Sequence, residues 1–220
     1  MIGQDFDYIQ KLINLGVISS PVLDFGVAGG GGGNNCKILI KEAGLSYVGT
    51  DMCEGTDVDI IANFEDSVDV QNKFKEKFST ILILNVLEHT FNPIEILDNA
   101  FSILKPGGNC VIIAPTVWPI HDFPIDCFRF NPTFYEEYCK RRSLNLLEDY
   151  FEYIGFYNVK FNMSGGSYVL PLPSRTKNIN YWYSKIVHRF FNTNGRAMSS
   201  ASHVAVGAVI QKNKQNYYIN

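Results

Sequence analysis

A glycine-rich segment carries the strongest chemical signal in the chain. It reads Val22-Leu23-Asp24-Phe25-Gly26-Val27-Ala28-Gly29-Gly30-Gly31-Gly32-Gly33 and lies between a short apolar run and a helical pattern. Glycines at such a junction let the backbone approach a ligand closely, and the amide groups that open the following helix point at it. The spacing Gly26-x-Ala28-x-x-Gly31 fits a dinucleotide fingerprint, whereas Asp24-x-Gly26-x-Ala28-x-Gly30 fits binders of S-adenosylmethionine (SAM). A flexible glycine turn without a ligand is the third interpretation.

Two aspartates bear on the choice among these ligands. Asp24 stands two residues before Gly26, where a carboxylate suits the ammonium group of a methionine moiety and would repel a pyrophosphate. Asp51 follows Gly31 by 20 residues and ends the second expected strand, so it can accept both ribose hydroxyls of an adenosine. Asp51 therefore supports a nucleoside ligand of either kind, unless it only caps a turn. Asp24 favours SAM.

The segment 116–132 brings further reactive side chains together. His121, Asp126 and Arg129 stand there among aromatic residues that include Trp118. A polar ring compound could lie against the aromatic rings while Asp126 and Arg129 direct hydrogen bonds to it. The alternative is that Asp126 and Arg129 pair with each other and only pin the loop. A stretch this long without a regular period is typical of a lid or binding loop.

Short apolar runs that alternate with segments of 3.6-residue period predict the elements that position these side chains. The expected strands are 21–25, 45–49, 58–62, 80–85, 110–114, 156–163 and 202–211, and the expected helices are 7–15, 34–43, 68–77, 93–104, 133–154 (with a break near 142–143) and 181–191. The run 80–85 is apolar on both faces, as a central parallel strand must be. The predicted fold is α/β: a doubly wound, mostly parallel, seven-stranded Rossmann-like sheet with an antiparallel closing strand.

Length and composition indicate one globular domain. The chain has 220 residues, of which 46% are hydrophobic and 19% charged, as in ordinary globular proteins. We expect a single domain over 1–212 and a flexible tail over 213–220. Its cofactor half would span about 20–115, and its acceptor lid would comprise about 116–132 and 164–200.

Charge, hydropathy and cysteine usage exclude several classes of protein. The net charge is −3 and the longest basic run is 140–142, too short for a nucleic-acid stripe. No apolar run approaches the roughly 20 residues that span a bilayer, and the first residues do not form a signal peptide. The 5 cysteines lack C-x-x-C spacing, so neither a disulfide framework nor a zinc site is indicated. We expect a cytoplasmic protein without a metal.

Four motifs together resemble those of the class I SAM-dependent methyltransferases. They are Asp24-x-Gly26, Gly49-x-Asp51, Asn85-Val86-Leu87-Glu88-His89 and Leu104-Lys105-Pro106-Gly107-Gly108, in the order and spacing of that family. The resemblance covers about residues 20–115 and is to the small-molecule type with "LEH" after strand four. The pattern H-x-x-P-x-D-x-x-R at 121–129 is similar to that of methyltransferases encoded with surface-polysaccharide genes.

The resemblance implies SAM as cofactor, S-adenosylhomocysteine (SAH) as product, and a set of contacts. The loop from Gly26 to Gly30 would wrap the methionine part, Asp51 would hold the ribose, and Met52 would pack on the adenine. Asn63 stands where the family often has an acidic residue near the adenine amino group, and Asn85 would lie beside the sulfonium. The full set of expected cofactor residues is Asp24, Gly26, Ala28 (in place of the family's usual glycine), Gly30, Asp51, Met52, Asn63, Phe64 and Asn85.

The resemblance also implies methyl transfer to a small acceptor, for which a general base helps if the acceptor is a hydroxyl or a protonated amine. We predict His121 as the first candidate base and His89 as the second, although His89 could equally be a structural histidine. Trp118, Asp126 and Arg129 would bind the acceptor. We expect O-methylation of a sugar-like molecule, such as a nucleotide-sugar, in polysaccharide biosynthesis.

Two other functions stay open. A SAM-binding module without catalysis, serving as a partner subunit, would need the same cofactor half. An NAD(P)-dependent oxidoreductase would explain Gly26-x-Ala28-x-x-Gly31 and Asp51, but not Asp24 or the Glu88-His89 step. The aromatic segment 181–191 could be a core helix or the face of a homodimer.

Overall fold

The computed structural model describes residues 3–28, 36–75, 77–118, 120, 125–155, 159–160 and 203–214. The helices are α1 (Gly3–Asn14), α2 (Lys37–Glu42), α3 (Ser67–Lys73), α4 (Pro93–Ile103) and α5 (Pro132–Arg142), with the single 3-10 turns η1 (Leu87–His89) and η2 (Glu148–Tyr150). The strands are β1 (Val22–Phe25), β2 (Tyr47–Asp51), β3 (Ile60–Ile61), β4 (Phe78–Leu84), β5 (Leu104–Pro115), β6 (Asn145–Leu146), β7 (Glu152–Gly155), β8 (Val159–Lys160) and β9 (His203–Gln211).

The strands form one sheet in the order β3-β2-β1-β4-β5-β9-β7-β8, and the two-residue β6 pairs with β9. The five strands from β3 to β5 are parallel, and β9 runs antiparallel between β5 and β7. The predicted doubly wound sheet and its antiparallel closing strand are therefore confirmed. β8 lies within the strand expected over 156–163, whereas β6 and β7 are additions to the seven expected strands. Strand order reverses between β1 and β4, and ligands of such sheets bind beyond the carboxyl ends of the strands at this point.

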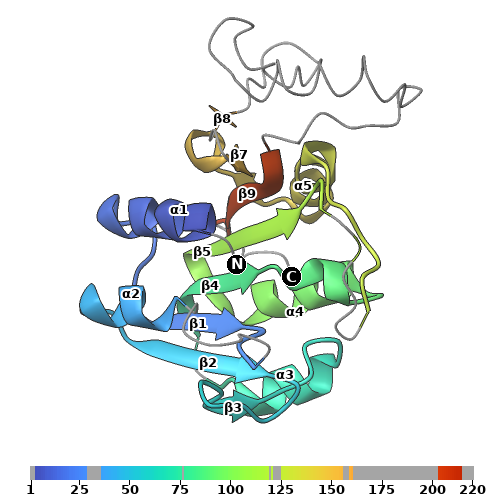
Figure 1. Cartoon of the computed structure of the whole chain (residues 1–220). Coiled ribbons are helices and arrows are strands. Elements are labelled where there is room, and N and C mark those ends of the chain that lie inside the picture. Colours follow the sequence, from blue (N-terminus) through green and yellow to red (C-terminus); the bar gives the residue numbers. More distant parts are fainter. Residues whose placement is uncertain are drawn as a thin grey trace, which may run out of the picture.

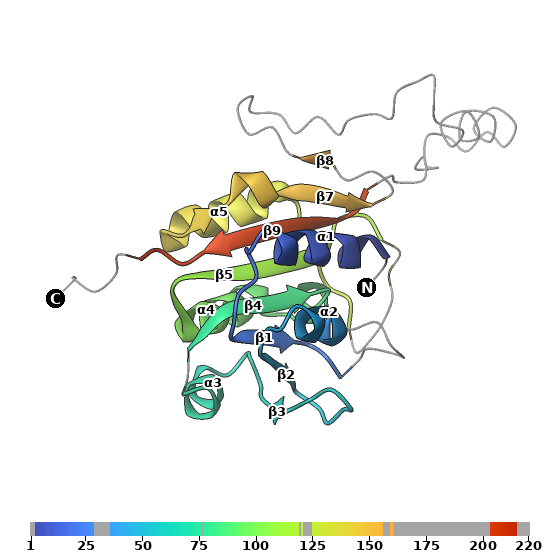
Figure 2. The same ribbon diagram turned by 90° about the vertical axis from the view of Figure 1, so that its left-hand side faces the viewer.

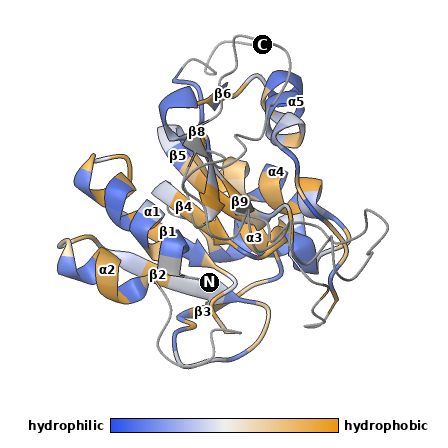
Figure 3. Ribbon diagram, turned by 45° about the horizontal axis from the view of Figure 1, so that its top comes forward, coloured by the Kyte–Doolittle hydropathy of each residue, from blue (hydrophilic) through white to orange (hydrophobic). Residues whose placement is uncertain are grey.

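Helices cover both faces of the sheet (Figures 1 and 2). On one face, α1 and α2 bury Tyr8, Leu12 and Ile40 against apolar side chains of β1, β4 and β5. On the other face, α3, α4 and α5 pack over a larger cluster that contains many aromatic rings. Hydrophobic residues concentrate on the strands in the middle of the molecule, while α1 and α5 are largely hydrophilic (Figure 3). The central strands are apolar on both sides because both of their faces are covered.

Two expected elements differ from the structure. The strand predicted over 110–114 begins already at Leu104, which pairs with Phe78 ahead of an irregularity in the ladder. The helix predicted over 133–154 ends at the break expected near 142–143 and does not resume, because Ser143 adopts a left-handed conformation (φ 51°) and Leu144 N donates to Cys139 O at 2.9 Å. This hydrogen bond closes the helix in a Schellman-like cap. The chain then supplies β6, η2 and β7 in place of helix.

Several predictions lie outside the described residues: the helix over 181–191, the whole lid segment 164–200, the tail beyond 214, and His121 in the loop 116–132. Within the described part, no helix has the length and apolar character needed to cross a bilayer.

Candidate active site

The turn that leaves β1 has room only for glycine. Gly26 has φ +85°, a left-handed conformation that side chains disfavour, and its amide donates to Thr50 O at 2.9 Å. A Cβ built on Gly26 would lie 2.3 Å from Cγ2 of Val86, the residue that follows the end of β4 by two positions. The exits of β1 and β4 therefore touch each other at the point where strand order reverses. Ala28 continues this turn, and Gly30 lies outside the described residues.

Asp51 ends β2 and receives the turn after β1. Its Oδ2 accepts the amide of Ala28 at 2.9 Å, and its Oδ1 accepts the amide of Cys53 at 3.2 Å. A carboxylate has about four lone-pair positions, so these two bonds orient Asp51 and leave capacity for further donors. Such an oriented acceptor at the end of the second strand suits a pair of ribose hydroxyls.

Asp24 lies one residue before the end of β1 and is buried. The phenol of Tyr47 in β2 donates to its Oδ2 at 3.0 Å. Burial raises the pKa of Asp24 to about 7; the bond from Tyr47 opposes this shift and the charge of Asp57 adds to it. A positive ligand group beside Asp24 would favour its charged form, since opposite charges nearby lower the pKa of a carboxyl.

A second buried acid, Asp5 near the start of α1, reaches the end of β4. Asn85 follows β4 with φ 56°, its amide donates to Ile113 O at 2.7 Å, and its Nδ2 donates to Asp5 Oδ2 at 3.1 Å. Burial raises the pKa of Cys36, with the charges of Asp24 and Asp5 adding to the effect. Asp24 thus lies near the end of β1 and Asp5 at the end of β4, the two strands between which the strand order reverses. Sequence reasoning missed Asp5, because a contact across 80 positions leaves no local pattern.

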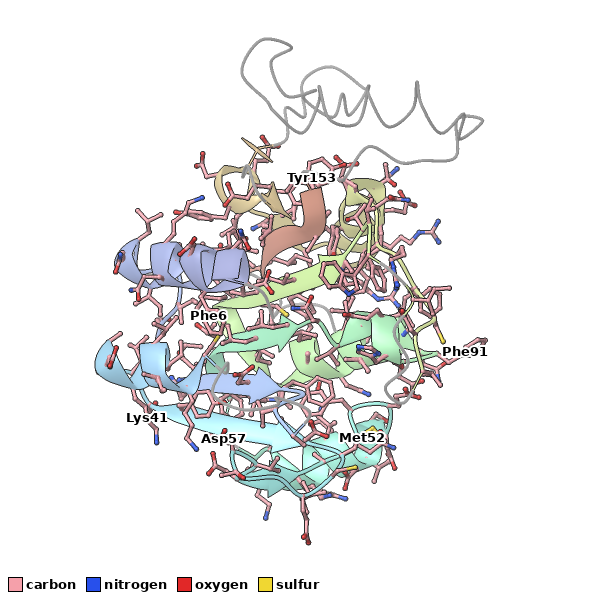
Figure 4. All side chains as sticks on the ribbon, in the orientation of Figure 1. Phe6, Lys41, Met52, Asp57, Phe91 and Tyr153 are labelled. Carbon is pink, nitrogen blue, oxygen red and sulfur yellow. The ribbon has the colours of Figure 1, made fainter. Side chains whose placement is uncertain are left out.

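Three other expected cofactor residues lie along the edge that follows β2 and β3. Met52 is 56% exposed, and in Figure 4 it lies at the side to which the parallel strands point, opposite Lys41. Asn63 is fixed at both ends, since its amide donates to Asp69 Oδ2 at 2.8 Å and its Oδ1 accepts Glu65 N at 2.9 Å. Phe64 is instead fully buried and stacks on Phe25 with centroids 4.2 Å apart. Its ring belongs to the core, so only its backbone could face a ligand.

These residues fit a cofactor that carries a nucleoside and a positively charged amino-acid part. Gly26 gives the turn after β1 a left-handed backbone packed against Val86, Asp51 offers oriented acceptor oxygens, and the buried acids Asp24 and Asp5 suit a cation.

His89 closes η1, the short turn that follows β4. Its Nδ1 lies 2.6 Å from Ile125 O. Because a carbonyl oxygen can only accept, Nδ1 must carry the proton of this bond, and in the neutral ring Nε2 then bears the lone pair. Nε2 lies 3.8 Å from Glu88 Oε1. The arrangement can take up a proton at Nε2 and stabilise the resulting charge with a carboxylate.

The loop after β5 is tied to η1 and carries an ion pair. Cys127 N donates to Glu88 O at 2.7 Å. The guanidinium of Arg129 contacts both oxygens of Asp126, with Nη2 to Oδ2 at 2.7 Å, and also donates to the carbonyl of Trp118 at 3.2 Å. The side chain of Trp118 is 42% exposed. The pairing interpretation of Asp126 and Arg129 is thus met geometrically, and their contact with an acceptor stays a prediction.

Glu88 is a candidate functional residue to which sequence reasoning gave no role. Its side chain is buried, its Oε2 has no hydrogen-bond partner, and the same holds for the hydroxyl of Tyr135 in α5. The "LEH" motif contained the signal for Glu88, but sequence cannot show that a buried oxygen lacks a partner. Across the described ranges, no group of three or more His, Cys, Asp or Glu side chains is placed to hold a metal ion.

The family model for a methyltransferase domain matches residues 6–160. The chain belongs to this methyltransferase family. It is a SAM-dependent methyltransferase, and its cofactor is SAM. No curated protein matches the chain.

Solved structures share the fold at low sequence identity. A SAM-dependent methyltransferase from Archaeoglobus fulgidus is 14% identical, with a TM-score of 0.57 over 96% of this chain and 95% of that one. The 1,6-didemethyltoxoflavin-N1-methyltransferase of Burkholderia thailandensis, with its substrate and SAH bound, is 11% identical, with a TM-score of 0.57 over 94% and 78%. A methyltransferase of Haloferax volcanii in complex with its Trm112 activator is 13% identical, with a TM-score of 0.52 over 90% and 83%.

Proposed function

We propose that this methyltransferase transfers a methyl group to a hydroxyl of a small, sugar-like acceptor. The observation that carries the proposal is the geometry of His89: its Nδ1 is held by Ile125 O at 2.6 Å, and its Nε2 lies 3.8 Å from a buried carboxyl. A histidine held in this way is suited to removing the proton of a neutral hydroxyl at Nε2, because the nearby carboxylate stabilises the imidazolium.

The cofactor half would act by binding and orientation. Asp51 would accept the ribose hydroxyls, Met52 would cover the adenine, and Asn63 would face its amino group. Asp24 and the amides of the turn from Gly26 through Ala28 to Gly30 would hold the methionine part, with Asn85 beside the sulfonium and the backbone of Phe64 nearby. SAM supplies an activated methyl group on a sulfonium, so the remaining task of the protein is in-line alignment.

The acceptor half would orient a polar ring. Trp118 is exposed beside the Asp126–Arg129 pair, and Phe91 is exposed on the same side of the molecule as Met52 (Figure 4). Aromatic faces of this kind suit the apolar faces of sugars, and Arg129 can donate to their oxygens. His121 is the alternative base. The resemblance of the loop at 121–129 supports a nucleotide-sugar acceptor in polysaccharide biosynthesis, which would place the protein in the cytoplasm. The aromatic segment 181–191 would supply the face of a homodimer.

The first test separates cofactor binding from chemistry. We expect calorimetric titration to detect SAH but neither NAD nor NADP. Asp51→Ala should weaken SAH at least about 100-fold, because two hydrogen bonds to a charged acceptor are lost. Asp98→Ala is the matched control: Asp98 also accepts from two side chains, Tyr138 and Arg142, but it lies on α4, and its loss should leave the SAH affinity unchanged. Binding of a nicotinamide cofactor alone would contradict the proposal.

The second test addresses the base. Methyl transfer from SAM to a panel of nucleotide-sugars should fall about 10²- to 10⁴-fold in His89→Ala while SAH binding persists. If His121→Ala alone loses turnover, the base is His121. If the wild-type protein binds SAH but methylates no member of the panel, the chain acts instead as a SAM-binding module or on a different acceptor class.

A further inference from the structure

The helix α1 carries an acid on its buried face. Its fully buried side chains are Tyr8, Ile9 and Leu12, which pack against the sheet. Asp5 stands three residues before Tyr8, so it takes the first position of the same apolar stripe, and it is only 2% exposed. Aspartate is rarely buried to this extent, because a carboxylate loses favourable hydration when it leaves water. The position of Asp5 therefore calls for an explanation.

Asp5 reaches the exit of β4. Nδ2 of Asn85 donates to Oδ2 of Asp5 at 3.1 Å and so joins residues 80 positions apart. Asn85 is itself fixed, since its backbone is left-handed with φ 56° and its amide donates to Ile113 O in β5 at 2.7 Å. The carboxyl group of Asp5 is therefore held at a defined place beside the residue that follows β4.

The helix dipole does not explain why this acid is buried. An acid in the first turn of α1 interacts favourably with the dipole. An exposed acid in that turn would gain the same interaction without the cost of desolvation. The burial of Asp5 against Asn85 therefore points to a purpose at the exit of β4 rather than to the stability of the helix.

The exit of β4 is where the positive charge of the cofactor is expected. Asp51 ends β2, Asp24 lies near the end of β1, and Asn85 follows β4, and these strands are neighbours in the order β2-β1-β4. Ligands of such sheets bind beyond the carboxyl ends of the strands, where the strand order reverses. With the ribose at Asp51, the groups on the 5′ carbon of adenosine would extend over β1 toward β4. In SAM, these groups carry the sulfonium and the ammonium.

The carboxyl group of Asp5 suits such a charge. The hydrogen bond from Asn85 favours its ionised form, and a nearby cation would favour that form further. Asn85 is half-buried, whereas Asp5 behind it is buried, so a ligand in the pocket would meet Asn85 first. Asp5 need not touch the ligand, because charges in a buried site act over several ångströms with little screening.

We propose that Asp5 is a positioning residue of the cofactor pocket, which orients the side chain of Asn85 and places behind it a negative charge that favours the positively charged part of SAM. The inference rests on the proposed function, since it adds α1 to the cofactor half. It assigns to Asp5 an effect on the charge of the ligand and none on its nucleoside.

The test is calorimetric titration with three ligands that share adenosine and a sulfur atom but differ in positive charge. SAM carries a sulfonium and an ammonium, SAH only the ammonium, and 5′-methylthioadenosine neither. Asp5→Asn keeps an oxygen that can accept from Asn85 but removes the charge. We therefore expect SAM to bind about 10-fold more weakly, as for one neighbouring charge in a partly buried site, and 5′-methylthioadenosine to bind as it does to the wild type.

The affinity for SAH identifies the group on which the charge acts. If SAH weakens by the same factor as SAM, the charge acts on the ammonium that both ligands carry. If SAH binds as before, the charge acts on the sulfonium, which methyl transfer converts into a neutral thioether. Both results support the inference, and the second would mean that Asp5 favours SAM over its product.

Two further variants separate this effect from net charge and from folding. Asp7→Asn is the matched control, because it removes the same charge from the same helix at an exposed position two residues further along. It should leave all three affinities unchanged. Asp5→Leu removes the charge and the oxygen that orients Asn85, and it extends the apolar stripe of α1. It should weaken SAM more than Asp5→Asn does, with Tm unchanged or higher.

The outcomes are distinguishable. If the wild type binds SAM and SAH, and Asp5→Asn leaves both affinities unchanged, the inference is wrong and the proposed function stands. An equal loss for SAM and 5′-methylthioadenosine would mean that Asp5 only maintains the shape of the pocket. A lowered Tm without any change in affinity would mean that it only stabilises α1, and either result would overturn the inference. If the wild type binds none of the three ligands, the proposed cofactor contacts fail and the inference fails with them.

Discussion

Asp24 and Glu88 are both buried carboxyl groups near the ends of neighbouring strands, yet the chain treats them differently. Asp24, on the cofactor side, accepts the phenol of Tyr47 at 3.0 Å. Glu88, in η1 after β4, keeps Oε2 without a described partner, and the phenol of Tyr135 is equally unpaired. Burial raises the pKa of both acids to about 7, so the surroundings penalise both charges in a similar way. The two acids differ in their hydrogen bonds: Tyr47 donates to Asp24, whereas no described group donates to Oε2 of Glu88.

The comparison separates carboxyl oxygens that the protein itself holds from one that it leaves unpaired. On the cofactor side, the bonds from Ala28 and Cys53 to Asp51 fix the acceptor oxygens before any ligand arrives. Such preorganisation reduces the entropy lost on binding. At η1 and α5, Oε2 of Glu88 and the hydroxyl of Tyr135 have no such partner among the described residues, which costs about 1–3 kcal/mol for each buried group.

The largest effect we expect concerns the close approach of Gly26 to Val86, where the exits of β1 and β4 meet. Gly26→Ala should destabilise the protein by about 4 kcal/mol, because the new Cβ would lie 2.3 Å from Val86 and φ is +85°. Urea denaturation measures the loss, and SAH titration should show weakened binding in whatever protein folds.

A second glycine provides the control for Gly26. Gly16 has φ +68°, but a Cβ there would meet nothing within 4 Å, so Gly16→Ala should cost only the backbone strain, about 1 kcal/mol. Adding Val86→Ala to Gly26→Ala should restore part of the lost stability by removing Cγ2. Equal losses at the two glycines would show that the contact between the β1 and β4 exits is unimportant.

The next effect is on the pH dependence of stability. Asp24 ionises at its ordinary 3.8 when unfolded but at about 7 when folded. Between these values the folded chain holds a proton that the unfolded chain has lost, so the free energy of unfolding falls as pH rises from about 4 to about 7. Asp24→Asn should remove a share of this fall on the order of 3 kcal/mol.

Urea denaturation at several pH values measures how much of the fall in the free energy of unfolding with pH is lost in Asp24→Asn. Glu88 contributes a fall of the same sign over a similar window, since its pKa is also raised to about 7. Asp98→Asn is the control: Arg142 and Tyr138 hold the pKa of Asp98 below its ordinary value despite partial burial, so its substitution should not flatten the fall. A slope that Asp24→Asn leaves unchanged would mean that Asp24 is well solvated.

The parts of the molecule that sequence predicted are those that local pattern dictates. Strand β4 was predicted because a run that is apolar on both faces is typical of a central strand covered by helices on both sides. The turn at Gly26 was predicted because glycines spaced closely after a strand indicate a backbone conformation that other residues disfavour. The break near 142–143 was predicted and is where α5 ends, but the strands that follow were not, because 144–154 has a helical pattern while β7 pairs with the distant β9.

The site residues likewise divide into those that a local sequence pattern indicates and those that only tertiary packing brings to the site. Asp24 and Asp51 stand at fixed distances from the glycines, so their positions could be inferred along the chain. Asp5 reaches Asn85 only through tertiary packing, and the unpaired state of Glu88 is a property of everything around it. Such features exist only in three dimensions.

Two matched substitutions compare a phenol that has a hydrogen-bond partner, Tyr47, with one that has none in the described part of the chain, Tyr135, and their expected effects on stability are smaller. Tyr47→Phe removes the donor to Asp24 and should cost about 1–2 kcal/mol, because it leaves a buried carboxyl without its hydrogen bond. Tyr135→Phe removes a phenol that has no partner in the described structure and should cost nothing or stabilise the protein slightly. Urea denaturation at one pH compares the two, and equal costs would contradict the distinction between the two sides.

The smallest effect we expect concerns the cofactor edge. In the wild type, Oδ1 of Asn63 accepts the backbone amide of Glu65 at 2.9 Å, and Asn63→Asp keeps an oxygen for this bond. In the proposed SAM complex, the variant would also give the adenine amino group a charged acceptor. Charged hydrogen bonds are the stronger ones, so we expect SAH to bind about 3-fold tighter. The new charge also stands close to Glu65, Asp66 and Asp69, and like charges at the surface cost about 0.5 kcal/mol.

Asn63→Asp should therefore move binding and stability in opposite directions, with SAH affinity raised and the free energy of unfolding lowered. Calorimetry and urea denaturation on the same preparation measure the two changes. Asn63→Ala is the companion variant: it loses the bond to Glu65 N as well as any bond to the adenine, so both quantities should fall together. If Asn63→Asp weakens SAH, then the repulsion dominates, and the amide at this position is the better partner for the cofactor in this chain.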